Sequence, residues 1–278
     1  AGLVSVGQQA YVGFGGYMLF ALTIFGGVSP LGAIALAGVL GALISIPVAF
    51  LIFRLRGAYF AIGTWVIAEV FRLSFAQISS LGGGSGSSLP VGIVKSLAAS
   101  RAGREHLSYW LALGSAVVVI AAVYVFLRSR NGLALTAIRD NELAAGSLGI
   151  DIWRTKFVVY VVTAALTAMI GALIFLQKLR ISPDAGFSVN DWTAFVIFIV
   201  VIGGIGTIEG PIIGTLIFFA LRETMADLGT IYLMALGVLA IIVMLKAPKG
   251  VWGLIRQKFN VELFPLSYRI IKKDNKRS

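Results

Sequence analysis

Few residues in this sequence could do chemistry, and the clearest candidates are two charges inside an apolar run. Glu69 and Arg72 lie three residues apart within 57–79, so on a helix they share a face and can pair. Charges inside a membrane segment are functional candidates by default, because burying them there is costly. They either line a pathway for a polar or zwitterionic solute or neutralise each other between helices. We favour the second role, because the sequence shows no further charged partner for them.

Other catalytic patterns are missing from the sequence. It has no cysteine and a single histidine, His106, which argues against thiolate chemistry and against a histidine-built metal site. The phosphate-binding pattern GxxxxGK[ST] is absent, as are HExxH and GxSxG. We therefore expect a protein that is not an enzyme, with no catalytic residue, no cofactor, no metal and no ATPase motif of its own.

The composition is that of a membrane protein. Hydrophobic residues make up 58% of the 278 positions and charged residues 13%, with a mean hydropathy of +0.94, whereas soluble domains carry about 25% charged residues. The 33 glycines fit membrane helices, whose backbones approach closely at small residues. This composition predicts an all-α, polytopic transmembrane bundle. The net charge of +11 then reflects membrane topology, and no nucleic-acid partner is expected.

A helix of about 20 apolar residues crosses a membrane, and the sequence predicts about eight such spans. In the second, Ala33, Ala37 and Gly41 form a small-residue stripe that favours close helix packing. The predicted spans are 8–26, 30–53, 57–79, 107–127, 156–177, 191–207, 210–226 and 230–246.

A cluster of glycines interrupts the apolar pattern near the C-terminal end of the sequence. It leaves two possibilities for 191–226, namely two crossings or a broken helix pair that lines a cavity enclosed by protein. The glycines of this predicted break are Gly203, Gly204, Gly206 and Gly210.

Lysines and arginines predict the orientation, because they concentrate in cytoplasmic loops. Most of the 23 fall in 54–56, in 128–156 and in the tail, which eight crossings place on one side together with both termini. We expect cytoplasmic N and C termini in a bacterial or archaeal cytoplasmic (inner) membrane. The membrane domain is predicted to be 1–246, and 247–278 a basic cytoplasmic tail held by anionic membrane lipid.

The stretch 131–151, NGLALTAIRDNELAAGSLGID, is unusually polar for a link between two spans. Asn131 is expected to cap one short helix, and Asp140 or Asn141 to start a second, which Gly149 ends. Composition leaves two roles open: a docking element through which a partner moves both flanking spans, or an amphipathic connector lying on lipid. We expect apolar contacts from Leu133, Ile138, Leu143 and Leu148, and polar contacts from Arg139 and Glu142.

The energy for any transport is expected to come from a partner. A proton- or sodium-driven carrier usually has more acidic or histidine residues in its helices, or matching broken helices in its two halves. Only one break, at 203–211, is clear.

Several segments resemble permeases of the LivM type, which belong to ABC importers for branched-chain amino acids. The segments occur in the family's order and cover most of the chain. They are SVGQQAYVGFGGY (5–17), LRGAYFAIGTWVIAEVFRL (55–73), GLALTAIRDNELAAGSLGI (132–150), GGIGTIEGPIIG (203–214) and KAPKG (246–250). Gln8 stands where the family usually has histidine, and Leu133 stands where it has a basic residue.

The resemblance implies a permease subunit that pairs with a homologous permease, two ATP-binding subunits on the cytoplasmic face and an external solute-binding protein. It also implies further helices before Ala1. A permease for urea, short amides or a sugar remains an alternative, as do a membrane scaffold and a secondary carrier. In the ABC permease that the resemblance implies, the segment 131–151 would be a coupling helix that binds the ATPase. The docking residues carried over from the family motif are Gly132, Ala137, Ile138, Arg139, Glu142, Ala145, Leu148 and Gly149.

Overall fold

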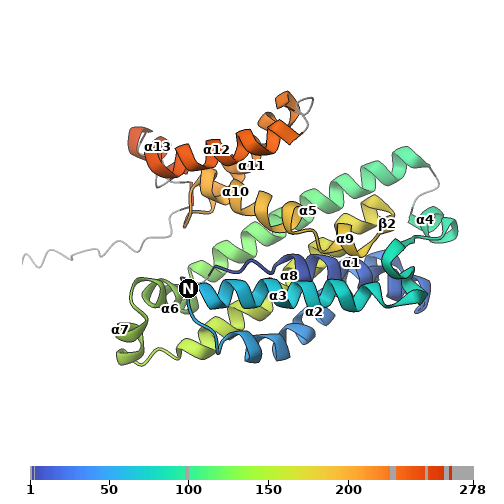
Figure 1. Cartoon of the computed structure of the whole chain (residues 1–278), viewed down its shortest axis with the longest axis horizontal. Coiled ribbons are helices and arrows are strands. Elements are labelled where there is room, and N and C mark those ends of the chain that lie inside the picture. Colours follow the sequence, from blue (N-terminus) through green and yellow to red (C-terminus); the bar gives the residue numbers. More distant parts are fainter. Residues whose placement is uncertain are drawn as a thin grey trace, which may run out of the picture. The chain divides into compact units, whose positions relative to one another are not determined.

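The computed structural model is almost entirely helical (Figure 1) and describes residues 2, 4–97, 100–225, 230–247, 250–259 and 263–264. Its helices and strands are α1 (Gln9–Ile24), α2 (Pro30–Ile52), α3 (Ala58–Ala76), the short 3-10 turns η1 (Ser79–Leu81) and η2 (Gly83–Ser85), β1 (Ser87–Ser88), α4 (Val91–Leu97), α5 (Arg101–Leu127), α6 (Arg130–Asp140), α7 (Glu142–Ser147), α8 (Ile152–Lys178), β2 (Arg180–Ile181), α9 (Pro183–Gly186), the π-helical turn η3 (Asn190–Ala194), α10 (Phe195–Gly203), α11 (Glu209–Met225), α12 (Thr230–Lys246) and α13 (Gly250–Phe259). The predicted all-α class is confirmed, apart from the short antiparallel pair β1–β2.

The chain divides into two compact units, which we describe separately. Unit 1 comprises Ala1–Val123 and Arg130–Ile197, and unit 2 comprises Tyr124–Ser129 and Phe198–Ser278. Most of the predicted tail, 247–278, lies outside the described residues. Its separation from a membrane domain 1–246 therefore stays a prediction.

Unit 1 is built around α8, which packs along both α1 and α2. The predicted stripe of small residues on α2 makes one of these contacts. Ala33 and Ala37 are fully buried, and a Cβ at Gly41 would lie 2.5 Å from the Ala168 side chain. Apolar side chains gain little by moving from lipid into protein. Membrane helices therefore associate where small residues let them approach closely.

The contact between α1 and α8 is closer still, because backbone touches backbone. A Cβ at Gly15 would lie 1.9 Å from the Ala168 carbonyl oxygen, and one at Gly171 would lie 2.2 Å from the Val12 carbonyl oxygen. Neither position has room for a larger residue. Most of α1 is buried as a result.

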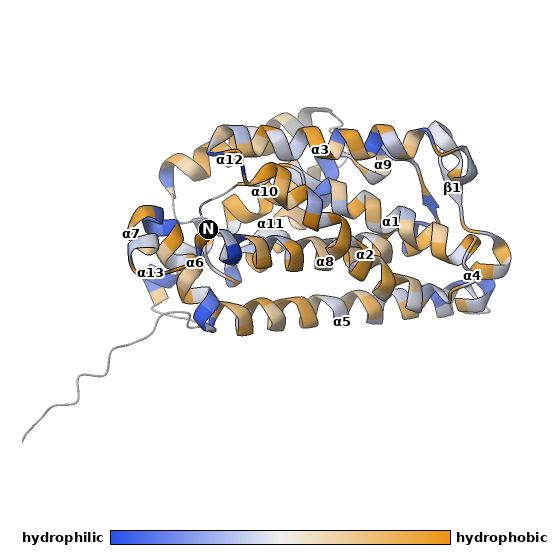
Figure 2. Cartoon of the chain, turned by 90° about the horizontal axis from the view of Figure 1, so that it is seen from below, coloured by the Kyte–Doolittle hydropathy of each residue, from blue (hydrophilic) through white to orange (hydrophobic). Residues whose placement is uncertain are grey.

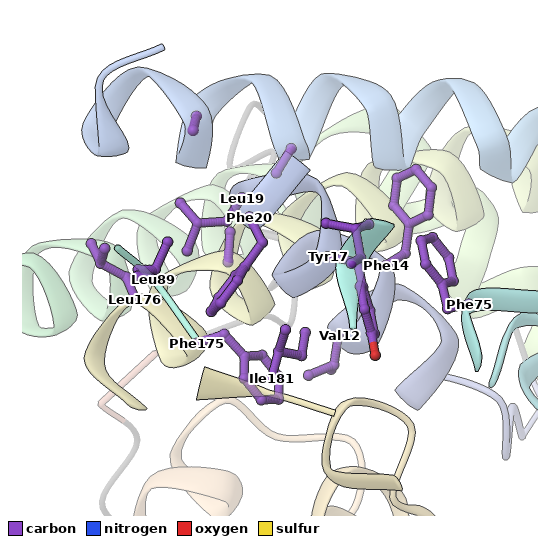
Figure 3. Packing of buried hydrophobic residues seen from close by; sticks show 14 of the residues in the cluster. Val12, Phe14, Tyr17, Leu19, Phe20, Phe75, Leu89, Phe175, Leu176 and Ile181 are labelled. Atoms are coloured by element: carbon purple, nitrogen blue, oxygen red, sulfur yellow. The ribbon is translucent and has the colours of Figure 1, made fainter. Parts of the chain in front are cut away.

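Aromatic and aliphatic side chains fill the space around α1 (Figure 3). The Tyr17 ring stacks on Phe75 of α3, with ring centroids 4.6 Å apart, and Phe14 meets the same ring edge-on at 6.1 Å. On the other side of α1, Phe175 and Ile181 pack at Gly16. These contacts join α1 to α3, α8 and β2 in one core.

The helices of unit 1 have two distinct ends. Gly7 lies beside Thr64 and Tyr17 beside Phe75, so α1 and α3 run in the same direction. Helix α8 starts directly after α7, at the end where Gly2 lies beside Arg139. We call this the α6–α7 end, and the opposite end, where β1 pairs with β2, the β1–β2 end (Figure 1).

Several helices expose apolar side chains. Within the described residues, five helical segments are long and apolar enough to cross a membrane, or six if the bent pair 234–246 and α13 is one span. Helix α5 has no buried residue, and Figure 2 colours most of it as hydrophobic. Such a surface suits lipid or another apolar protein surface. The expected eight crossings and cytoplasmic termini stay predictions.

Several predicted spans differ in extent from the structure. The segment expected at 8–26 contains α1, which has 16 residues and is short for a crossing. The segment expected at 191–207 belongs to a longer helical run, Pro183–Gly203. It starts earlier because Ser182 caps α9, accepting a hydrogen bond from the Ala185 N–H at 3.3 Å.

Gly15→Ala should destabilise the protein by about 3 kcal/mol, because the added methyl overlaps a backbone oxygen that cannot move away by changing rotamer. Gly114→Ala on α5 is the matched control. Nothing lies within 4 Å of a Cβ there, and alanine favours a helix by up to about 1 kcal/mol over glycine. Thermal unfolding in detergent, followed by size-exclusion chromatography, measures both. Equal stability of the two variants would contradict the close α1–α8 contact.

Candidate functional site

Residues 130–149 fold into two short helices joined at Asn141. Asn141 has an extended backbone, and its side-chain oxygen accepts a hydrogen bond from the Ala144 N–H at 3.0 Å, which caps α7. Gly149 follows α7 with φ +81° and ends it. Both features confirm the predicted second helix. The expected cap at Asn131 is wrong, because α6 already starts at Arg130.

The predicted docking residues separate into a buried and an exposed group. Gly132, Ile138 and Ala145 are buried, so they hold α6 and α7 in place, and Ala137 is half-buried. The remaining predicted residues are exposed; they are Arg139, Glu142, Leu148 and Gly149.

The expected apolar contacts of this segment are only partly present within the chain. Ile138 is 3% exposed, but Leu143 is 86% and Leu148 80% exposed, and Leu133 is also exposed. Exposed leucines on a short capped helix leave an apolar surface without a partner in the described part of the chain. Leu143, which was expected to make an apolar contact but is not among the docking residues carried over from the family motif, is the most exposed of the four.

The charges of the segment have defined partners. Lys156 of α8 donates to Glu142 at 2.8 Å, and its side chain is only 12% exposed, so this pair anchors α7 on α8. Arg139 pairs with the neighbouring Asp140 at 2.9 Å. Asp151 caps α8 by accepting from the Arg154 N–H at 2.9 Å. Much of the polarity of 131–151 therefore supports the geometry of its helices.

A second cluster of charges lies in unit 1, towards the β1–β2 end of α3. Arg72 donates through Nε and Nη2 to both oxygens of Glu69, at 2.6 to 3.1 Å, as the i, i+3 spacing predicted. It also donates through Nη1 to Asp184 Oδ1 of α9 at 2.8 Å. The arginine thus links α3 to α9. No local pattern indicates Asp184 as a partner, because it is 112 residues from Arg72.

The predicted glycine break is a tight turn in unit 2. A Cβ at Gly203 would lie 1.8 Å from the Gly210 carbonyl oxygen, and one at Gly214 would lie 2.0 Å from the Ile199 carbonyl oxygen, so α10 and α11 pack as an antiparallel hairpin. Two crossings joined by a tight turn and a broken hairpin both place α10 and α11 in this way, so both alternatives for 191–226 stay predictions. The turn itself needs glycine at Gly204 and Gly206, whose φ angles are +133° and +85°.

The start of α11 is capped by a residue that the sequence analysis did not single out. Thr207 Oγ1 accepts from the Gly210 N–H at 3.0 Å. Glu209, in the first turn of α11, is buried, and its Oε1 accepts from the Phe264 N–H at 2.8 Å. A Cβ at Gly250 of α13 would lie 2.3 Å from Gly204 Cα. The C-terminal segment of the described chain is thus held against this turn.

Among the residues that the structure describes, no group of three or more His, Asp or Glu side chains is placed to hold a metal ion.

Exchanging the charges of Glu69 and Arg72 should lower the stability of the protein, although the two exchanged side chains would still pair. In Glu69→Arg/Arg72→Glu, the new carboxylate faces Asp184. Adding Asp184→Lys should restore the contact between α3 and α9. Pairs this exposed contribute about 1 kcal/mol or less, which is about 2–4 °C in Tm. A double exchange as stable as the unaltered protein in a thermal unfolding assay would contradict the three-residue cluster.

Comparison with known proteins identifies a family that this chain matches over most of its length. Residues 1–247 match the model described as branched-chain amino acid transport system / permease component. The high-affinity branched-chain amino acid transport system permease protein LivM of Escherichia coli (strain K12) is 27% identical over 94% of this chain and 66% of its own length. This chain therefore spans slightly less than two thirds of that relative. No solved structure matches the chain.

Two shorter similarities extend the range of relatives. The permease protein LivH of the same E. coli system is 34% identical over 49% of this chain and 44% of its own length. The fructose import permease protein FruG of Bifidobacterium longum (strain NCC 2705) is 25% identical over 54% of this chain and 46% of its own length. The match to the family model over 1–247, together with the apolar helices, confirms the predicted family and fold class. The chain is a multi-pass membrane protein that belongs to the permease component family of branched-chain amino acid transport systems.

Proposed function

We propose that this chain is the membrane subunit of an ABC importer and forms, with a homologous permease, the pathway for branched-chain amino acids. Two separate ATP-binding subunits drive it from the cytoplasmic face, and an external solute-binding protein delivers the solute. The membrane is the cytoplasmic (inner) membrane of a bacterium or archaeon. The observation that carries the proposal is the capped α7 helix, which presents exposed leucines at one end of unit 1.

The structure of α6 and α7 suits a docking element better than a lipid-bound connector. Leu143 and Leu148 are exposed on a helix fixed by the Asn141 cap and by the pair between Glu142 and Lys156. A rigid apolar surface binds a protein partner at a low entropic cost, because little has to be ordered. The segment has only one basic residue from Asn131 to Asp151, Arg139, which gives little attraction to anionic lipid.

The orientation follows from the same element. If α7 meets ATPases, the α6–α7 end of unit 1 is cytoplasmic, together with the loop that contains Arg54 and Arg56. The β1–β2 end, with Lys178 and Arg180 beside it, then faces outward. The exposed apolar faces, of which α5 is the longest, are left for lipid and for the homologous permease.

A different solute is the second candidate for the same architecture. The relative from Bifidobacterium longum is named for fructose import, so related membrane subunits serve chemically different solutes. In this class of importer, the external binding protein would set most of the selectivity.

Affinity purification from native membranes, followed by ATP-driven uptake in proteoliposomes, tests the proposal. We expect a complex with two ATPase subunits and a second permease, and uptake of labelled leucine that requires ATP and the binding protein. Uptake of a sugar, urea or a short amide instead of leucine would favour the second candidate. A chain that purifies alone would favour a scaffold, and uptake driven by an ion gradient would favour a secondary carrier.

Leu143→Asp should reduce the amount of co-purified ATPase at least tenfold, because it places a charge in the proposed apolar contact without removing any contact inside this chain. Leu143→Met keeps an apolar surface of similar size and is the control. The ratio of ATPase to permease after purification measures the effect. If the ratio is the same for both variants, α7 is not the ATPase contact.

Arg139→Ala tests the coupling role of α6, because Arg139 is exposed and pairs only with Asp140 among the contacts described. We expect a normally folded complex whose ATP hydrolysis continues while leucine uptake falls at least tenfold. Arg101→Ala, in a similar exposed pair with Glu105 at 2.9 Å, should change neither. Full uptake by Arg139→Ala would exclude this residue from coupling.

A further inference from the structure

Three polar side-chain atoms near or on α1 are buried without a hydrogen-bond partner. They are Gln8 Oε1, Gln9 Nε2 and the Tyr17 hydroxyl. Gln9 and Tyr17 are both completely buried. Leaving such groups unpaired costs about 1–3 kcal/mol each, so each one calls for a physical reason.

The Gln9 amide lies at a polar contact between α1 and η3. Thr193 donates to Gln9 Oε1, and Thr193 Oγ1 also lies 3.4 Å from the Val6 carbonyl oxygen. If the amide were turned over, Nε2 would meet Thr193 and Oε1 would lose its partner, so either orientation leaves one end of the amide free. Thr64 of α3 completes the cluster by accepting from the Val6 N–H at 3.1 Å.

The chain segment opposite α1 and α3 is irregular. Between Pro183 and Gly203 it forms α9, an interruption, the π-helical turn η3 and α10. π-Helical turns are rare and are frequent at functional sites. This segment touches α1 and α3 at polar points on either side, at Asp184 with Arg72 and at Thr193 with Gln9.

Tyr17, Phe75 and Phe187 form an aromatic barrier, of which Phe187 lies between these two polar points along the segment 183–194. Tyr17 stacks on both phenylalanines, with centroid distances of 4.6 Å to Phe75 and 5.9 Å to Phe187, and the phenylalanines are 5.7 Å apart. The Phe187 ring fits against Gly13, where a Cβ would lie 2.4 Å from it. The unpartnered Tyr17 hydroxyl belongs to this barrier.

Polar groups elsewhere in the core of unit 1 have ordinary partners. Ser45 and Thr23 donate to carbonyl groups of their own helices at 2.7 Å. Tyr11 and Tyr160 bond each other at 2.7 Å across α1 and α8. The contacts of α8 with Gly15 are made by alanine and backbone. Two of the three unsatisfied groups, on Gln9 and Tyr17, therefore lie where α1 faces α3 and the segment 183–194.

We propose that this polar seam, formed by α1, α3 and residues 183–194, is the part of the translocation pathway that this subunit contributes. It would admit a small solute with hydrogen-bond donors and acceptors, the class to which amino acids belong. The charges of Glu69, Arg72 and Asp184 form its mouth at the β1–β2 end, the aromatic barrier closes it, and the Gln9–Thr193 cluster lies beyond. The inference rests on the proposed transport function and specifies where in this chain the solute passes.

The absence of cysteine makes the seam testable with single introduced thiols. Thr193→Cys and Thr64→Cys place a thiol in the seam. Ser45→Cys and Phe20→Cys place one at sites that are completely buried and lie outside it. The complete transporter in proteoliposomes is exposed to a membrane-impermeant methanethiosulfonate reagent during ATP hydrolysis. We expect the seam thiols to react at least tenfold faster than the controls.

A variant of the barrier gives a second readout. Phe187→Ala should raise the reaction rate of Thr193→Cys without ATP several-fold, because it removes the ring between the mouth and the inner cluster. Phe20→Ala removes a fully buried ring of the same core outside the barrier and should leave that rate unchanged. Size-exclusion profiles and uptake by each variant show that the complex is assembled.

The outcomes separate the two proposals. Seam thiols that react no faster than the controls in a complex with ATP-driven uptake would overturn the seam and leave the transport function intact. A complex with no ATP-driven uptake would overturn both. If the thiol of Thr193→Cys reacts equally fast with Phe187 and with Phe187→Ala, the aromatic barrier is not the element that closes the seam.

Discussion

Backbone contact between α1 and α8 determines how unit 1 is arranged. Lipid tails are as apolar as the side chains they surround, so membrane helices associate through close packing and polar contacts. Gly15 and Gly171 allow the two backbones to touch, and α2 packs on α8 through its own small residues. With α3 and the segment 183–194 on its remaining sides, most of α1 is buried in protein.

The burial of α1 explains why this helix can carry polar side chains. A glutamine facing hydrocarbon would pay the full cost of desolvation, whereas Gln9 meets a threonine and a neighbouring helix. Helix α5 shows the opposite situation. It has no buried residue, and its Ser115 donates to the Ala112 carbonyl of its own helix at 2.9 Å. Polar groups that need a partner from another element thus lie where protein surrounds them.

Features set by neighbouring residues could be predicted from the sequence, and features set by distant residues could not. The Glu69–Arg72 pair, the small-residue stripe on α2 and the Asn141 cap depend on spacings of three or four residues, and all three are present. Asp184 joins the charge cluster from far along the chain, so no local pattern indicates it. For the same reason the buried Gln9–Thr193 contact was not foreseen.

Within the docking segment, the sequence did not distinguish contacts inside the chain from contacts with a partner. Its apolar residues were all expected to make contacts, but hydrophobicity alone does not distinguish a residue that packs inside the chain from one that meets another protein. Ile138 packs inside, whereas Leu143 is exposed. The pattern of a short amphipathic helix is compatible with either arrangement. The family resemblance implied a partner, but the structure was needed to show which side chains are available to it.

A continuous series of contacts connects the proposed docking helix with the proposed pathway. Glu142 ties α7 to Lys156 of α8, α8 meets the backbone of α1 at Gly15, and α1 holds Thr193 through Gln9. The α8–α1 step is rigid, because backbones in contact have no side chain that can yield. The Gln9–Thr193 step is a hydrogen bond with an unpaired group beside it, which makes it the easier of the two to separate. In the proposed importer, a displacement of α7 would therefore move α8 and α1 together and open first where α1 faces the segment 183–194.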